Sequence, residues 1–375
     1  MSRTKQPAIV NITEEIRAST YLAQGRSNIR TQEQTDIVRL GNIANKTYAG
    51  ENLAVKFAQE IADFTDEWEW IKARITAGNF DGLNIGDYIS VTCTNNNTFN
   101  ARIAGINTYK GYGDTAVSNH IDFISASVWP TAFKMNLKNF NNGLPSTENL
   151  TGDGTTTAFV LTRPFPSITE VKVGGTATTA YTYDAATHTI TFTTAPADQA
   201  AITVSCAKQE CPWQVSNGYH FLNSLAGSVP NGTGNDPELE AVDYTSGGVY
   251  YFLPDALKNV IVEKLLLLPK RFSASGIQSN DTGLSWVDAG KLWLPSEVEI
   301  TGAPIWGNAG YGAGGFVQYP LFAQNMNRNI GRNYWWSLSS SAGSSANFVC
   351  FYSGGNVSYY GASGDFRGPV CFRIS

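Results

Sequence analysis

The sequence predicts an α+β protein in which β-strands dominate. Short segments of alternating apolar and polar residues recur along most of the chain, and glycine or proline separates them. Only a few short stretches have helical periodicity. Charged residues make up 15% of the 375 residues, against roughly 25% in an average soluble protein. This combination is typical of a turn-rich β protein, or of one whose surface is largely covered by neighbouring subunits.

Helices are expected near the start of this pattern, over residues 51–64 and 68–77, the second ended by Gly78. The 45 residues at the beginning of the chain contain too few apolar side chains to form a core of their own. We therefore expect residues 1–63 to form an N-terminal arm, partly extended and partly helical, that becomes ordered on another subunit. The first helix is predicted from apolar residues at three- and four-residue spacing, namely Leu53, Phe57, Ile61 and Phe64.

The middle of the chain contains an insertion. Residues 149–206 are rich in Thr, Ala and Val, with evenly spaced short strands and no helical periodicity, which predicts a small β-sandwich. After Cys206 the composition returns to that found before the insertion. We therefore expect one larger domain, formed by residues 64–148 plus 207–375, that is interrupted by the sandwich.

Composition argues against several classes of partner. The net charge is −5 and no run of Lys or Arg exceeds two residues, so nucleic acid is not expected to bind. No apolar stretch is long enough to span a bilayer, and the first residues do not form an apolar signal region, so no membrane is expected either. The five cysteines have irregular spacing and no CxxC, which predicts reduced, mostly buried thiols.

The most informative segment covers residues 333–375, which are dense in Trp, Tyr, Phe, Ser, Asn and Gly and nearly free of charge. Four short strands are expected there. Large aromatic rings mixed with small hydrogen-bonding residues are typical of a binding surface, although Tyr352, Tyr359 and Tyr360 also fit ordinary strand positions. The candidate surface residues are Ser341, Ser344, Asn347, Tyr352, Asn356, Ser358, Tyr360 and Asp365.

Other motifs have plainer interpretations. Residues 310–315 match the GxGxxG pattern, but a strand does not precede them and a helix does not follow, so a surface loop is expected. Glu297 and Glu299 follow Ser296, which predicts a capped helical turn rather than an acid/base pair. The large aromatic residues expected in the core are Trp286, Trp293, Trp335 and Trp336.

No metal or cofactor is expected. Of the histidines, at positions 120, 188 and 220, only His220 lies near cysteines, Cys206 and Cys211, and packing is the simpler explanation for each. Acidic loop residues such as Asp281 could supply oxygen ligands to calcium. The triplets by which many sugar-binding domains hold calcium, Glu-Pro-Asn, Gln-Pro-Asp and Trp-Asn-Asp, do not occur in the chain.

An ordered set of short motifs resembles a family of uncharacterised phage and prophage domains of gut Firmicutes, which is associated with the C-type-lectin-like fold. The likeness covers residues 65–148 and 207–375. Residues 149–206 separately resemble the small immunoglobulin-like modules that phages insert into tail and capsid proteins. The motifs of the larger domain are Trp68-Glu-Trp-Ile, Ile85-Gly-Asp-Tyr, Ala104-Gly-Ile-Asn, His120-Ile-Asp-Phe, Pro212-Trp, Phe221-Leu-Asn, Leu253-Pro, Lys291-Leu-Trp-Leu-Pro, Trp335-Trp-Ser-Leu-Ser and Pro369-Val-Cys-Phe-Arg-Ile.

The resemblance implies a non-enzymatic bacteriophage virion protein that displays a recognition surface, either for host attachment or for decoration of the capsid or tail. It implies a location in the virion after synthesis in the host bacterial cytoplasm. The expected partners are other phage structural proteins, a host cell-surface glycan or protein, and further copies of the chain, with a trimer favoured.

Two alternatives stay open. Formylglycine-generating oxidases share the lectin-type fold and use reactive cysteines, for which Cys350 and Cys371 are the candidates. An environment that lowers a thiol pKa is not evident around either position in the sequence. The second alternative is a bacterial surface adhesin encoded by a prophage, against which the missing signal peptide and anchor count.

Overall fold

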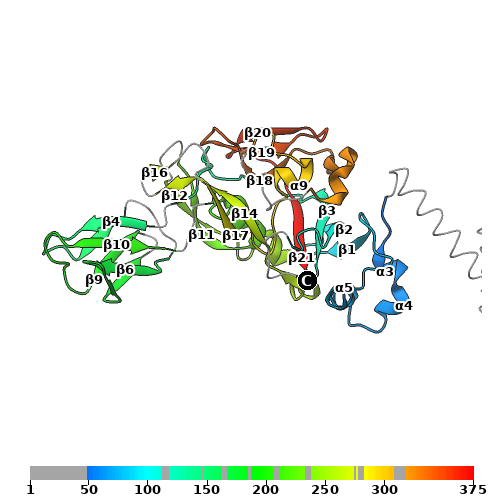
Figure 1. Cartoon of the computed structure of the whole chain (residues 1–375), viewed down its shortest axis with the longest axis horizontal. Helices are drawn as coiled ribbons and strands as arrows, with labels where there is room; N and C mark the ends of the chain where they lie inside the picture. Colours follow the sequence, from blue (N-terminus) through cyan, green and yellow to red (C-terminus); the bar gives the residue numbers. More distant parts are fainter. Residues whose placement is uncertain are drawn as a thin grey trace, which may run out of the picture. The chain divides into compact units, whose positions relative to one another are not determined.

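The computed structural model describes residues 49–375 except 112–117, 145–146, 162–166, 185–186, 207–210, 233–237, 274–275, 278–282 and 308–317. Gly50–Ser375 form one compact unit built mainly from antiparallel strands, with short helices (Figure 1). The expectation of an α+β protein dominated by strands is confirmed. No helix among the described residues is long and apolar enough to cross a membrane.

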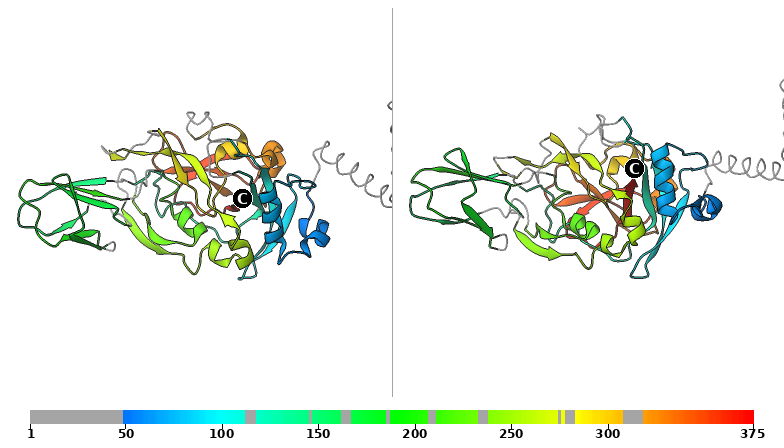
Figure 2. Two further views of the ribbon diagram at one scale, coloured as in Figure 1. Left: turned by 60° about the horizontal axis from the view of Figure 1, so that its bottom comes forward. Right: turned by 90° about the horizontal axis from the view of Figure 1, so that it is seen from below.

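A five-stranded antiparallel sheet holds the two ends of the unit together. The C-terminal strand β21 (from Pro369) lies between β3 and β13, so the last residues of the chain complete a sheet that begins at Tyr88. Figure 2 shows this red strand beside the cyan strands of the N-terminal part. The strands, in sheet order, are β1 (Tyr88–Thr92), β2 (Thr98–Ile106), β3 (Ile121–Val128), β21 (Pro369–Ile374) and β13 (Ile261–Val262).

The helix α5 (Glu67–Ala77) confirms the sequence prediction for residues 68–77. Asp66 caps its first turn by accepting hydrogen bonds from the backbone N–H groups of Trp68 (2.8 Å) and Glu69 (2.9 Å). Gly78 ends the helix in the left-handed conformation, at φ 67°, which glycine adopts without steric cost.

The single helix predicted over residues 51–64 is wrong. The segment forms two short helices, α3 (Leu53–Lys56) and α4 (Ala58–Ile61), separated at Phe57, whose φ of −112° departs from helical geometry. The Phe57 ring instead packs 5.0 Å from the ring of Trp70 and 4.8 Å from the guanidinium of Arg74. Since Leu53 is fully buried in the main core, residues 50–63 belong to the compact unit rather than to an arm.

The described residues of the inserted segment form seven short strands in two antiparallel sheets, with a cluster of buried residues of its own. Its first and last strands pair with each other, Thr147 opposite Ser205, so the chain enters and leaves the segment at adjacent points. One sheet contains β4 (Thr147–Thr151), β10 (Ala201–Ser205), β6 (Glu170–Val173) and β7 (Thr176–Thr178); the other contains β5 (Ala158–Val160), β9 (Thr189–Phe192) and β8 (Tyr181–Asp184).

Short elements complete the larger core. Trp293, Trp335 and Trp336 are buried there as predicted, but Trp286 is 43% exposed. Trp286 lies on a two-stranded ribbon in which Val287 takes the buried face, and successive side chains of a strand point to opposite faces. The elements are α6 (Asn217–Asn223), β11 (Ala226–Pro230), β12 (Leu239–Asp243), α7 (Val249–Phe252), α8 (Asp255–Lys258), β14 (Leu265–Lys270), β15 (Phe272–Ser273), β16 (Gly276–Ile277), β17 (Gly283–Asp288), α9 (Glu297–Thr301), η2 (Pro320–Ala323) and η3 (Asn325–Arg328).

The aromatic C-terminal segment forms a separate three-stranded antiparallel sheet in the order β18-β19-β20. These strands are β18 (Trp335–Ser340), β19 (Asn347–Phe351) and β20 (Val357–Gly361). β18 is linked to the segment before β21 because the backbone N–H of Trp336 donates to the carbonyl of Arg367 at 2.9 Å. Of the four strands predicted in residues 333–375, three therefore share one sheet and the fourth belongs to another.

Candidate functional site

Four aromatic side chains meet on one face of the β18-β19-β20 sheet, and we call them the ring cluster: Tyr334, Tyr352, Tyr360 and Phe366. Tyr334 and Tyr352 stack with ring centroids 4.8 Å apart, and Phe366 lies 5.5 Å from Tyr334 and 5.0 Å from Tyr360. Tyr334 is 46% exposed and Tyr360 50% exposed. The cluster thus presents aromatic area to solvent while its members support one another.

A buried tryptophan holds the ring cluster from below. The ring of Trp336 lies 4.6 Å from that of Phe366, and its indole N–H donates to the carbonyl of Phe133 at 3.0 Å. Above it, the hydroxyl of Ser358 donates to the phenol oxygen of Tyr352 at 3.1 Å. Because the supporting indole is fully buried and hydrogen-bonded, the exposed rings rest on a rigid base.

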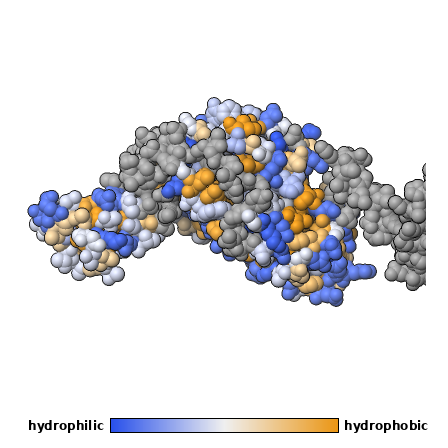
Figure 3. Space-filling model, viewed as in Figure 1, coloured by the Kyte–Doolittle hydropathy of each residue, from blue (hydrophilic) through white to orange (hydrophobic). Residues whose placement is uncertain are grey.

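The surface around the ring cluster carries little charge. No charged residue occurs between Asn333 and Gly364. The guanidinium of Arg367 is used internally, because it donates to the carbonyl of Pro130 at 3.0 Å and to the side-chain oxygen of Asn333 at 3.1 Å. At the top of the view, near β19 and β20, Figure 3 shows mostly pale residues of intermediate hydropathy with a small hydrophobic patch among them. Binding at this surface would therefore depend on ring contacts and hydrogen bonds more than on ion pairs.

The residues predicted from sequence fall into three groups. Tyr352, Ser358 and Tyr360 lie in or beside the ring cluster, and Asn356 and Asp365 are exposed in the turns near it. Ser344 and Asn347 are half-buried, before and at the start of β19, away from the strand end that leads to Tyr352.

Ser341 does not lie on this surface. It is only 4% exposed, and its carbonyl accepts a hydrogen bond of 2.7 Å from the buried guanidinium of Arg271. Tyr334 and Phe366 were not among the predicted residues. The period-two spacing of Tyr334 and Trp336 is the signal that could have identified Tyr334, since alternate residues of a strand share a face.

A second aromatic pair lies at β20 on the opposite face of the sheet. The rings of Trp306 and Tyr359 meet edge to face at 4.6 Å, and both are about two-fifths exposed. The buried carboxylate of Glu297 positions this loop by accepting the backbone N–H groups of Trp306 and Gly307, each at 2.8 Å. Burial raises the pKa of Glu297 above its ordinary value, although these hydrogen bonds oppose the effect.

The turn that carries Glu297 begins with the predicted cap. The Ser296 hydroxyl accepts the backbone N–H of Glu299 at 3.2 Å, and the Glu299 carboxylate accepts the backbone N–H of Ser296 at 2.7 Å. This reciprocal pair is a capping box. The prediction that Ser296 caps a helical turn is confirmed.

Glu299 also belongs to a buried charge cluster that the sequence analysis did not predict. Lys264 lies 2.6 Å from Glu299 and 3.5 Å from Asp122, and Arg373 lies 2.6 Å from Asp122. The hydroxyls of Tyr109 and Tyr319 complete it by donating to Glu299 and Asp122, respectively. The two negative charges of Asp122 and Glu299 balance the two positive charges of Lys264 and Arg373, and all four side chains are at most 1% exposed.

The electrostatics of this charge cluster are those of a structural ion pair network. Burial opposes ionisation of Asp122, but the charges of Arg373 and Lys264 outweigh it and hold the pKa of Asp122 well below its usual range. Burial, together with Glu299, raises the pKa of Tyr109 well above its ordinary value. Because the charged groups are sealed from solvent and paired with one another, they connect elements rather than contact a substrate.

The cysteine prediction is confirmed, since Cys93, Cys206, Cys211, Cys350 and Cys371 are all free and buried. Burial raises the pKa of Cys350 to about 12 and that of Cys371 well above its ordinary value. A nucleophilic thiol needs the opposite shift and access to solvent. The oxidase alternative based on these two thiols therefore lacks support from their surroundings.

The histidines with described side-chain contacts are packed residues. His120 is fully buried, and its Nε2 accepts the backbone N–H of Tyr109 at 3.1 Å. His220 donates from Nδ1 to the carbonyl of Ser216 at 2.9 Å. Within the described ranges, no group of three or more His, Cys, Asp or Glu side chains is placed to hold a metal ion. The GxGxxG match at 310–315 lies outside the described residues.

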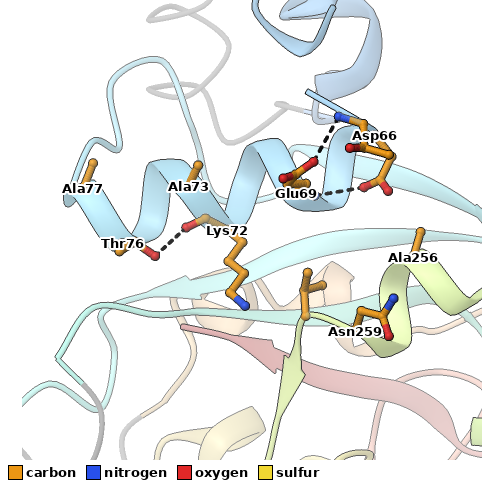
Figure 4. A pocket seen from close by; sticks show the side chains of 10 residues that line it. Asp66, Glu69, Lys72, Ala73, Thr76, Ala77, Ala256 and Asn259 are labelled. Atoms are coloured by element: carbon orange, nitrogen blue, oxygen red, sulfur yellow. Dashed lines mark hydrogen bonds between the residues drawn. The ribbon is translucent and has the colours of Figure 1, made fainter. Parts of the chain in front are cut away.

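A surface hollow of about 760 Å³ separates α5 from α8. Figure 4 shows Lys72 reaching from α5 into it, with Ala256 and Asn259 on the facing segment. The two carboxylates that line the hollow already accept backbone hydrogen bonds at the start of α5: Asp66 caps the helix, and Glu69 accepts the N–H of Thr65 at 3.0 Å. The hollow therefore offers few uncommitted polar groups, and the ring cluster is the stronger candidate site.

No protein-family model, no curated protein and no solved structure matches this chain.

Proposed function

We propose that this chain is a non-enzymatic structural protein of a bacteriophage virion, in which a C-type-lectin-like domain presents the ring cluster as a recognition surface and residues 149–206 form an inserted immunoglobulin-like sandwich. The observation that supports it most directly is the set of exposed rings Tyr334 and Tyr360 held on buried Trp336. The sequence resemblance to phage domains supplies the biological setting.

The ring cluster has properties that favour binding. Its rings offer large contact area and have few torsions to fix, so little conformational entropy is lost when a ligand covers them. Support from Trp336 reduces that loss further. The ligand class is a glycan or protein on the host cell surface, and weak local charge predicts that binding changes little with salt concentration.

Host attachment and decoration of the particle are both compatible with this surface. In either case the partners are other phage structural proteins, reached through the N-terminal arm, and the assembly is a homo-oligomer for which a trimer is favoured. Imaging of intact particles distinguishes the two roles. A few copies at the tail favour attachment, whereas hundreds over the head favour decoration.

Replacing rings tests the recognition surface. We expect Tyr334→Ala combined with Tyr360→Ala to weaken binding to host cells about tenfold or more, because truncating aromatic anchors typically costs more than about 1 kcal/mol of binding free energy. Trp286→Ala is the matched control, since it removes an exposed ring from a different sheet. Equal binding of all three proteins in a cell pull-down would contradict a role for the ring cluster.

Truncation tests the anchoring role separately. A chain that lacks residues 1–45 should fold normally, because the compact unit begins at Gly50, but should be missing from purified particles. Quantitative mass spectrometry of particles measures the copy number relative to the major head protein. If the truncated chain is present at the normal copy number, the arm is not the anchor.

A further inference from the structure

Strand β20 forms the edge of its sheet, and its hydrogen-bonding pattern defines which groups face outward. Two hydrogen bonds at the ends of the strand show which of its residues bond to β19. The N–H of Tyr352 donates to the C=O of Asn356 at 2.9 Å, and the N–H of Ala362 donates to the C=O of Ala346 at 2.8 Å. In an antiparallel pair, every second residue of a strand directs its backbone N–H and C=O toward the neighbouring strand, and the residues between direct theirs away from it. Even-numbered residues of β20 therefore bond to β19, and the backbone groups of Val357, Tyr359 and Gly361 point away from it.

Two of these three residues are available to a further strand. Within the described part of the chain, the N–H and C=O groups of Val357 and Tyr359 have no hydrogen-bond partner. Gly361 is different, because its carbonyl accepts the N–H of Gly364 at 2.9 Å and Asn139 lies close against its Cα. An incoming strand thus finds two donors and two acceptors, in alternation.

This edge also lacks several of the features that usually prevent pairing. Proteins protect exposed edges with charged side chains, prolines or β-bulges. Residues 353–364 contain no charged residue and no proline, and the register between β19 and β20 is regular. Exposed rings stand on both faces of the strand, Tyr359 on one and Tyr360 on the other.

We infer that β20 pairs with β20 of a second copy of this chain, antiparallel about a two-fold axis through Ser358. In this register Val357 of each copy lies opposite Tyr359 of the other, so all four free groups of each strand find partners. A two-fold axis through Tyr359 would instead require Gly361, whose carbonyl is already used. The free groups therefore select one self-complementary register.

The side chains suit the same register. Each Tyr359 ring faces a Val357 side chain, an aromatic and β-branched pair of the kind that stabilises adjacent strands. Tyr360 faces Asn356 on the other side of the sheet, and the two Ser358 residues face each other. The inference does not depend on the proposed function. A two-fold contact produces a dimer, so the trimer favoured from the sequence would need a different surface.

Cross-linking tests the register directly. Residues opposite each other in a non-hydrogen-bonded pair have Cα atoms about 4.5 Å apart, which suits a disulfide. We expect Ser358→Cys to form a disulfide-linked dimer under mild oxidation, and the five native thiols are buried and do not compete. Ser353→Cys, in the exposed turn before β20, is the control. If Ser358→Cys cross-links no better than this control, the pairing is wrong.

A proline variant tests the main-chain bonds without disturbing the sheet. Tyr359→Pro removes an N–H that points outward, so pairing with β19 is retained, and Tyr359→Ala removes the ring but keeps that N–H. We expect the dimer dissociation constant, measured by sedimentation, to be about tenfold higher for the proline variant than for the alanine variant. Equal constants, a wild-type monomer at every concentration, or a trimer would overturn the inference. Circular dichroism verifies that both variants fold.

Discussion

The buried ammonium of Lys264 constrains how three elements of the fold meet. This ammonium lies 2.6 Å from the Glu299 carboxylate, and the ring centroids of Tyr109 and Trp293 lie at 4.2 and 4.6 Å. A buried ammonium is tolerated only with such partners, and removing one partner of a buried pair leaves an uncompensated charge. The charge cluster therefore makes the joining of β3, β21 and α9 highly specific, since a shift of any one element would leave a charge unpaired.

His120, beside this cluster, predicts a pH dependence of stability. Burial, reinforced by the nearby charges of Arg373 and Lys264, lowers its pKa from 6.5 to about 4, although Asp122 opposes the shift. The unfolded chain therefore binds more protons than the folded chain between these pH values. The free energy of unfolding should fall as the pH is lowered through this window, by up to about 1 kcal/mol per pH unit.

Urea denaturation of the wild type and of His120→Gln at several pH values between 7 and 4 measures this effect. The variant should lose the part of the slope that comes from His120, whatever its stability at neutral pH. Parallel slopes for the two proteins would show that His120 is protonated equally in the folded and unfolded states. Carboxylates such as Asp122, with a lowered pKa, lose their contribution only at still lower pH.

At the scale of elements, the fold depends on how short segments end and on which sheet they join. α5 has a capping residue and a left-handed glycine at its ends, so local chemistry defines it. β21 has no such local signal for its position. Its place between β3 and β13 depends on residues such as Arg373, which pairs with Asp122 across 251 positions of sequence.

The cap of α5 provides an element-scale prediction. Asp66→Ala removes the acceptor for the backbone N–H groups of Trp68 and Glu69, and it should reduce the free energy of unfolding by about 1 kcal/mol. Asp63→Ala is the control, because Asp63 is an exposed acid just before α5 and outside the cap. Chemical denaturation should separate the two variants. A loss of the same size in the control would assign the effect to general charge rather than to capping.

At the scale of the whole molecule, the described residues contain two separate hydrophobic clusters. The larger one includes residues from both sides of the insertion, such as Phe123 and Phe372, which stack at 5.2 Å. The smaller one lies entirely within the insertion. Since Thr147 and Ser205 are neighbours on paired strands, the larger core does not need the inserted residues to close the chain.

Excision tests this independence. Replacing residues 147–206 by a short Gly-Ser linker should leave the larger domain folded, with the same denaturant midpoint, because the chain enters and leaves the insertion at adjacent points and a short linker can join them. Binding through the ring cluster should also be retained. Aggregation of the shortened protein, or a clearly lower midpoint, would show that the insertion stabilises the domain around it.

Part of the candidate site was predictable because local patterns carried it. The aromatic, weakly charged segment 333–375 and the positions Tyr352, Ser358 and Tyr360 follow from composition and strand alternation. The complete ring cluster could not be predicted in this way, because it includes Phe366, which lies in the segment that leads into β21. Ser341 was misplaced because its burial depends on Arg271, 70 positions away.

The sequence by itself determined the dominance of strands, helix α5 and the glycine that ends it, the cap Ser296, the burial of the thiols and the low charge of the C-terminal segment. Each of these depends on contacts within a few residues or on composition alone. Only the tertiary structure decided the break at Phe57, the exposure of Trp286, the position of β21 and the buried charge cluster. Those features depend on side chains that are distant in sequence, and a local pattern contains no information about which of them will meet.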